Sequence, residues 1–302
     1  MKKVTFKSEG LTLVGNLFLP ANFSDNNKYP AVVVSGSWTT VKEQMAGLYA
    51  AKLADEGFIA LAFDFRNFGE SEGEPRFYES PTLKINDIQN AVSFLSNLPE
   101  VYSGRIGAFG VCAGAGYTLQ AAAADERIKA VVTTASWLHD GEAVKMFYGG
   151  EEGVAAKVQA ARAAKKNYAE HGVIEYIPSI STTDESAAMY GPYDYYLNPE
   201  RGAIAEWSAD KFAVMTWEDW LTFDPTTTAK DVKVPTLMIH SDGAVLPDYA
   251  KQYFEKIGSE DKALRWVETE LHSPFHQFSF YDQPEEVALS IDEAQAWFSQ
   301  KL

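Results

Sequence analysis

A single cysteine lies in a sequence context that could make it a nucleophile. Cys112 is part of Gly110-Val-Cys112-Ala-Gly114, between an apolar run that predicts a strand and small residues that predict a helix. Glycines two residues before and two after keep Cβ atoms away from the crossing strand and helix, as a nucleophile elbow requires. The helix N-terminus would favour a thiolate, so we expect a lowered pKa for Cys112. The alternatives are an inert buried cysteine and a dinucleotide-binding loop, although the glycine spacing does not give GxGxxG after the first strand.

A thiol nucleophile needs a general base, and the base needs an acid that orients it. Behind a nucleophile elbow, the acid and the histidine follow the nucleophile in that order along the chain. Asp242 stands where the late strand predicted over residues 234–240 ends, and we predict it as the acid; the alternative is a turn former before Gly243. Only two histidines follow Asp242, in a predicted loop. We predict His276 as the base, with His272 as the alternative.

Acyl transfer also needs backbone N–H groups that stabilise a tetrahedral oxyanion. We expect one from Ala113, directly after the nucleophile, and another from the loop that follows the valine-rich strand 31–35. In that loop Trp38 is the predicted donor and Ser37 the alternative. An ordinary strand-to-helix turn would produce the same local sequence.

Strand and helix patterns alternate on either side of these residues. This alternation predicts an α/β protein with a mostly parallel, doubly wound sheet, helices on both faces and an antiparallel pair at the start. The expected strands are 4–6, 11–19, 31–35, 58–63, 105–110, 128–134, 234–240 and 264–269, and the expected helices are 44–56, 82–96, 112–124, 249–257 and 285–300.

The alternation stops between residues 140 and 230, a stretch that is helical at first and then rich in aromatic residues. An insertion late in a parallel sheet, above the strand ends, predicts a helical cap over a core of residues 1–139 and 231–302. The aromatic residues predict a pocket for a bulky, largely apolar substrate, with Tyr195, Trp217 and Trp220 as binding residues. The alternative is an accessory subdomain that only packs.

Composition narrows the possible partners and cofactors. Among 302 residues, 42 acidic and 26 basic side chains give a net charge of −16, which argues against nucleic acid or an anionic membrane as partner. The sequence contains no signal peptide, no transmembrane run and only one cysteine, so we expect a soluble, cytoplasmic protein. No histidine–carboxylate cluster has metal-ligand spacing, so we expect neither a metal nor an organic cofactor. A homo-oligomer is possible.

Four motifs resemble those of α/β-hydrolases related to dienelactone hydrolase, over nearly the whole chain. The resemblance implies the α/β-hydrolase fold, and dienelactone hydrolase itself uses a cysteine nucleophile. The long cap is similar to that of capped relatives, including polyketide acyltransferases. The motifs are Val41-Lys-Glu-Gln44, Phe63-Asp-Phe-Arg66-Asn-Phe-Gly69-Glu-Ser71-Glu-Gly73, Gly110-Val-Cys-Ala-Gly114 and Phe280-Tyr-Asp-Gln-Pro284.

Two positions depart from the pattern of these relatives. Ser35-Gly-Ser-Trp38 replaces a loop of the His-Pro-x-Gly-Gly type, and Gln277 stands where relatives with an intact triad often have histidine. We predict a cysteine-nucleophile hydrolase that cleaves ester, lactone or thioester bonds of a small-molecule acyl substrate through an acyl-enzyme. The alternatives are an acyltransferase of the same mechanism and a hydrolase-like binding protein, a pseudoenzyme whose histidine is displaced.

Overall fold

The computed structural model describes all 302 residues and is built around an eight-stranded sheet. β1 pairs antiparallel with β2, β2 pairs antiparallel with β4, and all other neighbouring strands run parallel. The predicted α/β fold class is confirmed, including its antiparallel start. The strands, in their order across the sheet, are β1 (Lys2–Ser8), β2 (Leu11–Phe18), β4 (Ile59–Phe63), β3 (Tyr29–Ser35), β5 (Val101–Val111), β6 (Ile128–Thr134), β11 (Thr236–Ser241) and β12 (Lys262–Val267).

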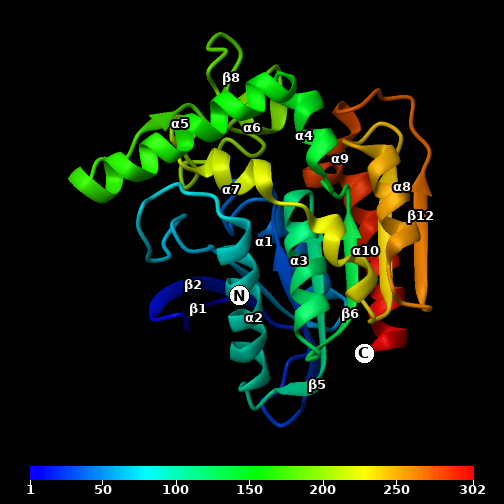
Figure 1. Cartoon of the computed structure of the whole chain (residues 1–302). Coiled ribbons are helices and arrows are strands. Elements are labelled where there is room, and N and C mark those ends of the chain that lie inside the picture. Colours follow the sequence, from blue (N-terminus) through cyan, green and yellow to red (C-terminus); the bar gives the residue numbers. More distant parts are fainter.

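Helices cover both faces of this sheet, which explains the continuous apolar runs of its central strands. In Figure 1, α2 (Pro81–Ser96), α3 (Ala113–Ala124) and α8 (Pro247–Lys256) lie in front of the sheet, while α1 (Met45–Asp55) and α10 (Pro284–Lys301) lie behind it. None of the helices combines the length and the apolar character needed to span a bilayer.

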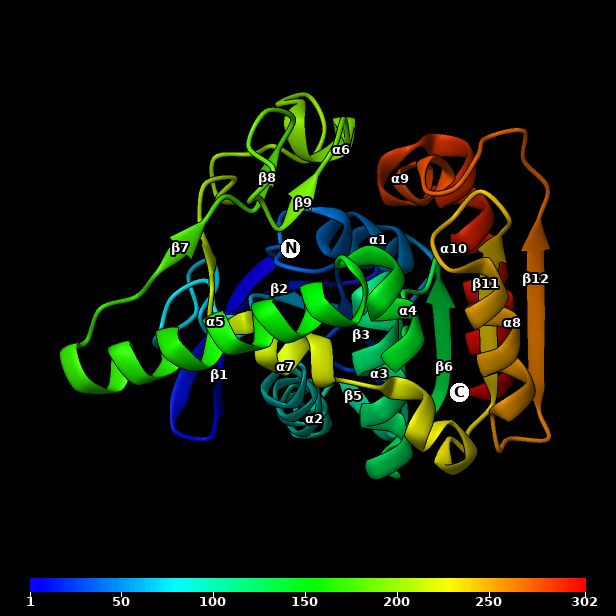
Figure 2. The ribbon, with the colours of Figure 1, turned by 45° about the horizontal axis from the view of Figure 1, so that its top comes forward.

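The chain between β6 and β11 leaves the sheet and forms a separate layer of helices and short strands. Figure 2 shows α4 and α5 of this layer crossing over the sheet, with α6 and the short strands beside them. Besides the expected helices it contains two small sheets, β7 with β10 and β8 with β9. Its elements are α4 (Gly141–Phe147), α5 (Gly150–His171), β7 (Tyr176–Ile177), β8 (Ile180–Ser181), β9 (Met189–Tyr190), α6 (Asp194–Leu197), β10 (Phe212–Ala213), α7 (Thr216–Thr222) and the 3₁₀ helix η1 (Pro225–Asp231).

One helix occupies a segment for which the sequence predicts a loop. α9 (Phe275–Asp282) carries both His276 and the neighbouring Gln277, and it leads directly into α10. Because successive residues of an α-helix are rotated by about 100° around its axis, His276 and Gln277 point in different directions.

Two motifs shared with the resembled family meet in a buried ion pair behind the loop that follows β3. The Asp64 carboxylate accepts hydrogen bonds from the Lys42 N–H (2.9 Å), from Lys42 Nζ (2.7 Å) and from the Glu70 N–H (2.9 Å). Gln44 of the same motif donates to the Gly202 carbonyl oxygen at 2.6 Å and so ties this loop to the cap. These motifs hold the loops around the site in place.

A second buried carboxylate, Glu79, joins four parts of the structure. It accepts hydrogen bonds from Lys84 Nζ (2.8 Å), from the Thr39 N–H after β3 (2.9 Å) and from the Tyr117 hydroxyl on α3 (2.7 Å). Its own N–H donates to Thr216 Oγ1, at the start of α7, at 3.0 Å. Glu79 and Lys84 are both buried, and burial lowers the pKa of Lys84 while the Glu79 charge opposes that shift.

We expect Lys84→Met to lower the free energy of unfolding by about 3–5 kcal/mol, because it leaves the buried Glu79 carboxylate without its cation. Urea denaturation measures the loss. The double variant Glu79→Gln/Lys84→Met removes both charges and should recover part of that stability. Lys166→Met, at an exposed lysine, is the matched control and should change stability by less than about 0.5 kcal/mol. Equal losses in the single and double variants would contradict the importance of the charge pair.

Candidate active site

Cys112 lies on a tight turn between β5 and α3. Its backbone has φ 56° and ψ −121°, a strained conformation for a residue with a side chain. A Cβ atom at Gly110 would lie 2.6 Å from the Ala115 Cα, and one at Gly114 would lie 2.3 Å from the Gly36 carbonyl oxygen. The two glycines therefore permit the close approach that the elbow motif predicts.

The sulfur of Cys112 is surrounded by hydrogen-bond donors but is hardly exposed. The neighbouring N–H groups of Ala113 and Trp38 and the hydroxyls of Ser37 and Tyr281 each act to lower the pKa of its thiol. Burial nevertheless raises the pKa of the Cys112 thiol, because these donors do not compensate for its removal from water. The expectation of a lowered pKa is therefore wrong, and the resting group is a neutral thiol.

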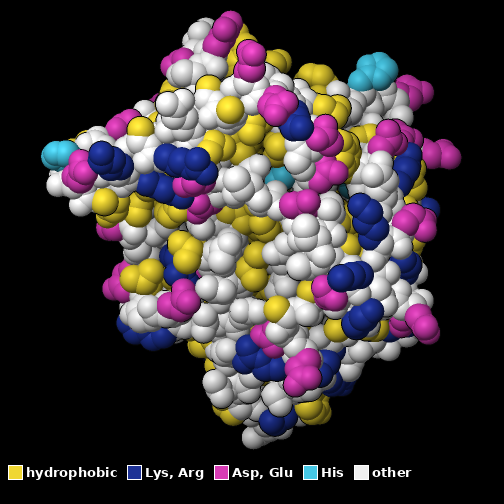
Figure 3. All heavy atoms as spheres, in the orientation of Figure 1, with side chains coloured by type: hydrophobic (Ala, Val, Ile, Leu, Met, Phe, Trp, Pro, Cys, Tyr) yellow, Lys and Arg dark blue, Asp and Glu magenta, His cyan; other side chains and the backbone are white.

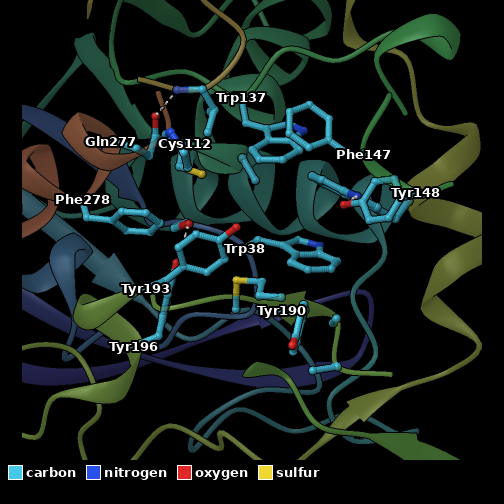
Figure 4. Close-up of a pocket in the computed structure, with 18 of the residues that line it drawn as sticks. Trp38, Cys112, Trp137, Phe147, Tyr148, Tyr190, Tyr193, Tyr196, Gln277 and Phe278 are labelled. Carbon is cyan, nitrogen blue, oxygen red and sulfur yellow. Dashed lines mark hydrogen bonds between the residues drawn. The ribbon is translucent and has the colours of Figure 1, made fainter. Parts of the chain in front are cut away.

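The thiol opens into an apolar cavity of about 490 Å³ between the core and the cap. Seventeen of its 23 lining residues are hydrophobic, which suits an apolar ligand. Figure 4 shows aromatic side chains from the core and from the cap converging on the space beside Cys112. They are Trp38, Trp137, Phe147, Tyr148, Tyr190, Tyr193, Tyr196, Trp217, Trp220, Phe278 and Tyr281.

The structure places two of the three predicted substrate-binding residues in the cavity wall. Trp217 and Trp220, both on α7, line it. Tyr195 does not: its ring packs against the rings of Tyr196 and Tyr281, with centroids 5.1 and 5.0 Å apart. Consecutive residues of the short helix α6 point in different directions, so the neighbouring Tyr196 reaches the cavity instead.

The predicted chain of hydrogen bonds from Cys112 through His276 to Asp242 is not formed. His276 Nδ1 lies 2.7 Å from the Ser241 hydroxyl and Nε2 lies 3.2 Å from Glu286, so both ring nitrogens have other partners. The Asp242 side chain is 72% exposed. Its carboxylate accepts from Lys251 Nζ (3.0 Å) and Trp266 Nε1 (3.1 Å), toward the sheet edge at β12 and away from the thiol.

The alternative base, His272, is exposed in the loop before α9 and does not line the cavity. Of the two adjacent residues on α9, His276 and Gln277, it is Gln277 that faces the cavity, where it is buried and lines the wall (Figure 4). Its Oε1 accepts from the Val245 N–H at 3.1 Å, and its Nε2 donates to the Ala135 carbonyl oxygen at 2.6 Å. Gln277 thus occupies the place of a general base with a group that does not accept a proton at neutral pH.

A chain of hydroxyl groups beside the thiol was not predicted. The Tyr196 hydroxyl donates to Ser37 Oγ (2.9 Å), which lies 3.2 Å from the Tyr281 hydroxyl, and Gln277 Nε2 donates to the same Tyr281 oxygen at 3.3 Å. The sequence indicates Ser37 only as a backbone N–H donor and Tyr281 only as part of a family motif. These groups give the cavity floor a neutral, hydrogen-bonded surface around the sulfur.

A buried histidine connects the core to the cap helix α7. His139 Nδ1 accepts from Trp137 Nε1 at 2.9 Å, so Nε2 carries the proton and donates to the Trp220 carbonyl oxygen at 3.1 Å. Burial lowers the pKa of His139 to about 4. The ring is therefore neutral in the folded protein at neutral pH. No group of three or more His, Cys, Asp or Glu side chains is gathered to hold a metal ion.

Residues 9–273 match the family described as X-Pro dipeptidyl-peptidase (S15 family). The chain belongs to this family. Since the match covers the elbow and most of the sheet, the protein is an enzyme of the α/β-hydrolase type. The match ends before α9, so it does not cover Gln277 and Tyr281.

Individual proteins show the same relationship. The uncharacterized protein YcjY of Escherichia coli (strain K12) is 30% identical over 315 residues, which cover 99% of each chain. The hypothetical protein PA2218 from Pseudomonas aeruginosa has a crystal structure with a TM-score of 0.86 at 31% identity, covering 100% of this chain and 93% of that one. The polyketide transferase claH of Penicillium crustosum is 36% identical over 133 residues, 44% of this chain and 43% of that protein.

Dienelactone hydrolase from Anabaena variabilis shares the fold, with a TM-score of 0.57 at 15% identity and coverage of 100% of this chain and 97% of that one. The family match and the similarity to fungal transferases confirm the resemblance to this group of α/β-hydrolases, and dienelactone hydrolase adds the shared fold.

Because burial keeps Cys112 neutral, we expect iodoacetamide to alkylate it at pH 7 at least about tenfold more slowly than a small-molecule thiol. The rate should continue to rise with pH beyond the range where ordinary thiols ionise, near 8.5. The urea-unfolded protein is the control and should react as an ordinary thiol. Fast labelling with a plateau below pH 7 would show a stabilised thiolate and contradict the neutral resting state.

The neutral His139 makes stability pH-dependent in a defined direction. The unfolded chain binds a proton at this residue below about pH 6.5, whereas the folded protein does so only near pH 4. Stability is therefore lost as the pH falls through this window, by about 2 kcal/mol between pH 7 and pH 5. Urea denaturation of the wild type and of His139→Gln at both pH values measures the difference. The variant should lose clearly less stability than the wild type, and identical pH dependence would refute this assignment.

Proposed function

We propose that Cys112 accepts an acyl group from an activated donor and holds it as a thioester in the apolar cavity. One observation carries the proposal: the sulfur lies on the elbow, faces the N–H groups of Ala113 and Trp38, and opens into a cavity lined mainly by hydrophobic side chains. Two such donors beside a tetrahedral intermediate stabilise its oxygen anion by about 3 kcal/mol each. The lining suits a bulky, largely apolar acyl group.

When the donor is a thioester, acylation of Cys112 does not need a histidine to take up the thiol proton. The Cys112 sulfur forms a bond to the carbonyl carbon, the bond from that carbon to the donor sulfur breaks, and the thiol proton ends on the leaving thiolate. Thiol–thioester exchange therefore has no net proton transfer to the protein. An ester donor with a poorer leaving group would need an acid beside it, and Gln277 does not supply one.

Gln277 also affects which acceptor can remove the acyl group from Cys112. Hydrolysis requires a base that removes a proton from water, whereas the amide of Gln277 is held by Val245 and Ala135 and does not act as a base. We therefore propose that water is a slow acceptor and that an amine or thiol nucleophile is a better one. This favours acyl transfer over hydrolysis, as the names of the polyketide transferase claH and the acyltransferase drtE of Aspergillus calidoustus state for those relatives.

Gln277 also supports a second candidate function. If no donor acylates the buried neutral thiol, the cavity serves to bind an apolar molecule, and the protein is a hydrolase-like binding protein. The saturated hydrogen bonds of Gln277 favour this candidate because they stabilise the site without a base.

Intact-mass spectrometry distinguishes these candidates. Incubation with the N-acetylcysteamine thioester of octanoic acid should add one octanoyl group to the wild type and none to Cys112→Ala. The adduct should persist for hours, since no base activates water. Gln277→His should shorten its lifetime by about 10² to 10⁴, the usual effect of a positioned general base.

Gln277→Met is the matched control, since it alters the same side chain without supplying a base, and its adduct should stay long-lived. Absence of any adduct on the wild type while octanoate still binds would overturn the acyl-enzyme and leave the binding protein. A wild-type adduct that is lost within seconds would overturn the preference for transfer.

A further inference from the structure

The long cap helix α5 carries four cationic side chains, and three of them are paired with carboxylates. Arg162 and Lys165 both contact Glu218, Lys165 also contacts Asp219, and Lys166 lies 3.8 Å from Glu170. The fourth cation, Lys157, has no carboxylate within 4 Å.

Lys157 is also the only cationic residue among the 23 that line the cavity beside Cys112. Its Nζ lies 4.5 Å from the centre of the Trp217 ring, and Trp217 is part of the same wall. The one carboxylate that lines the cavity, Glu185, is not within ion-pair distance of it. Figure 3 shows the Lys and Arg side chains of α5 gathered toward its carboxyl end, with hydrophobic atoms in the hollow beside the other half.

An ammonium group in this position is partly removed from water without compensation by a charge. Burial accordingly lowers the pKa of Lys157, with no opposing contribution from a neighbouring acid. The Trp217 ring holds the cation over the cavity wall through a cation–π contact. A ligand anion would complete the site, and the acidic surface elsewhere would not attract one.

We propose that the molecule bound in this cavity carries an anionic group, a carboxylate or a phosphate, that pairs with Lys157 while its apolar part lies along the aromatic wall. This inference rests on the proposed function in one respect: it takes the carbonyl group of the bound molecule to point toward Cys112. The anion has two chemical sources. It is either a carboxylate at the far end of the acyl chain or a phosphate on the thiol that delivers the acyl group.

Binding to the Cys112→Ala protein tests this independently of acylation, because that protein forms no thioester. Tryptophan fluorescence should show octanoate binding roughly tenfold more tightly than 1-octanol, a neutral ligand of equal chain length. A second pair, pantetheine 4′-phosphate and pantetheine, tests the alternative source of the anion. The preference should weaken in 0.5 M salt, as expected of a partly exposed ion pair.

The variants assign any such preference to one residue. Lys157→Met keeps the aliphatic stem over Trp217 but should abolish the preference, so that the anionic and the neutral ligand bind about equally tightly. Lys157→Arg keeps the positive charge and should retain the preference for the anionic ligand. Lys166→Met, on the same helix but outside the cavity, is the matched control and should leave the preference unchanged. A Lys157-dependent preference in the octanoate pair places the anion on the acyl chain, and one in the pantetheine pair places it on the donor. The proposal is overturned if neither pair shows a preference, or if the preference survives in Lys157→Met.

Discussion

The arrangement of the site depends on one buried carboxylate. Glu79 has no access to water, so its oxygens must be satisfied by groups of the protein, and the groups that do so come from distant parts of the chain. The Thr39 N–H comes from the loop that holds Trp38, and the Tyr117 hydroxyl comes from the helix that begins after Cys112. Since moving either segment would leave a buried charge unsatisfied, Glu79 fixes the distance between the two N–H donors and the thiol. Thr216 extends the same constraint to α7 and to the cavity wall.

Within this frame the groups around the sulfur are uncharged, and this limits the chemistry that they support. The thiol is protonated at rest, His139 is neutral, and the position beside the sulfur is taken by an amide. A cysteine–histidine ion pair would create the nucleophile in advance, whereas a neutral thiol depends on a donor whose leaving group takes up the proton. The apolar lining suits a largely apolar ligand.

Family membership and fold do not determine the reaction in this protein. Its relatives include proteins named as a polyketide transferase, an acyltransferase and a thiohydrolase. Function in such folds resides in a few side chains at the strand ends. In our proposal those groups are Cys112, the two N–H donors and Gln277, together with the aromatic residues and Lys157 of the cap, all of which line the cavity or adjoin it.

The sequence alone determined the features that depend on local geometry. The alternation of apolar and amphipathic runs predicts the parallel sheet, and the glycines around Cys112 predict the elbow, because both follow from the backbone conformation of a few neighbouring residues. The sequence also indicated Gln277 as a replacement for histidine. It did not indicate the partners of Glu79, which lie 5, 38, 40 and 137 positions away along the chain.

Only the tertiary structure decided which of several candidate side chains reach the thiol. The sequence predicted a loop where α9 forms, and in a flexible loop His276 could approach Cys112. In the helix it is rotated by about 100° from Gln277, so it contacts Ser241 and Glu286 while Gln277 faces the cavity. The direction of Asp242, toward Lys251 and Trp266, is likewise set by neighbours that the linear pattern does not reveal. Rotation about a helix axis and the choice of hydrogen-bond partner depend on packing between distant segments, which residue spacing does not encode.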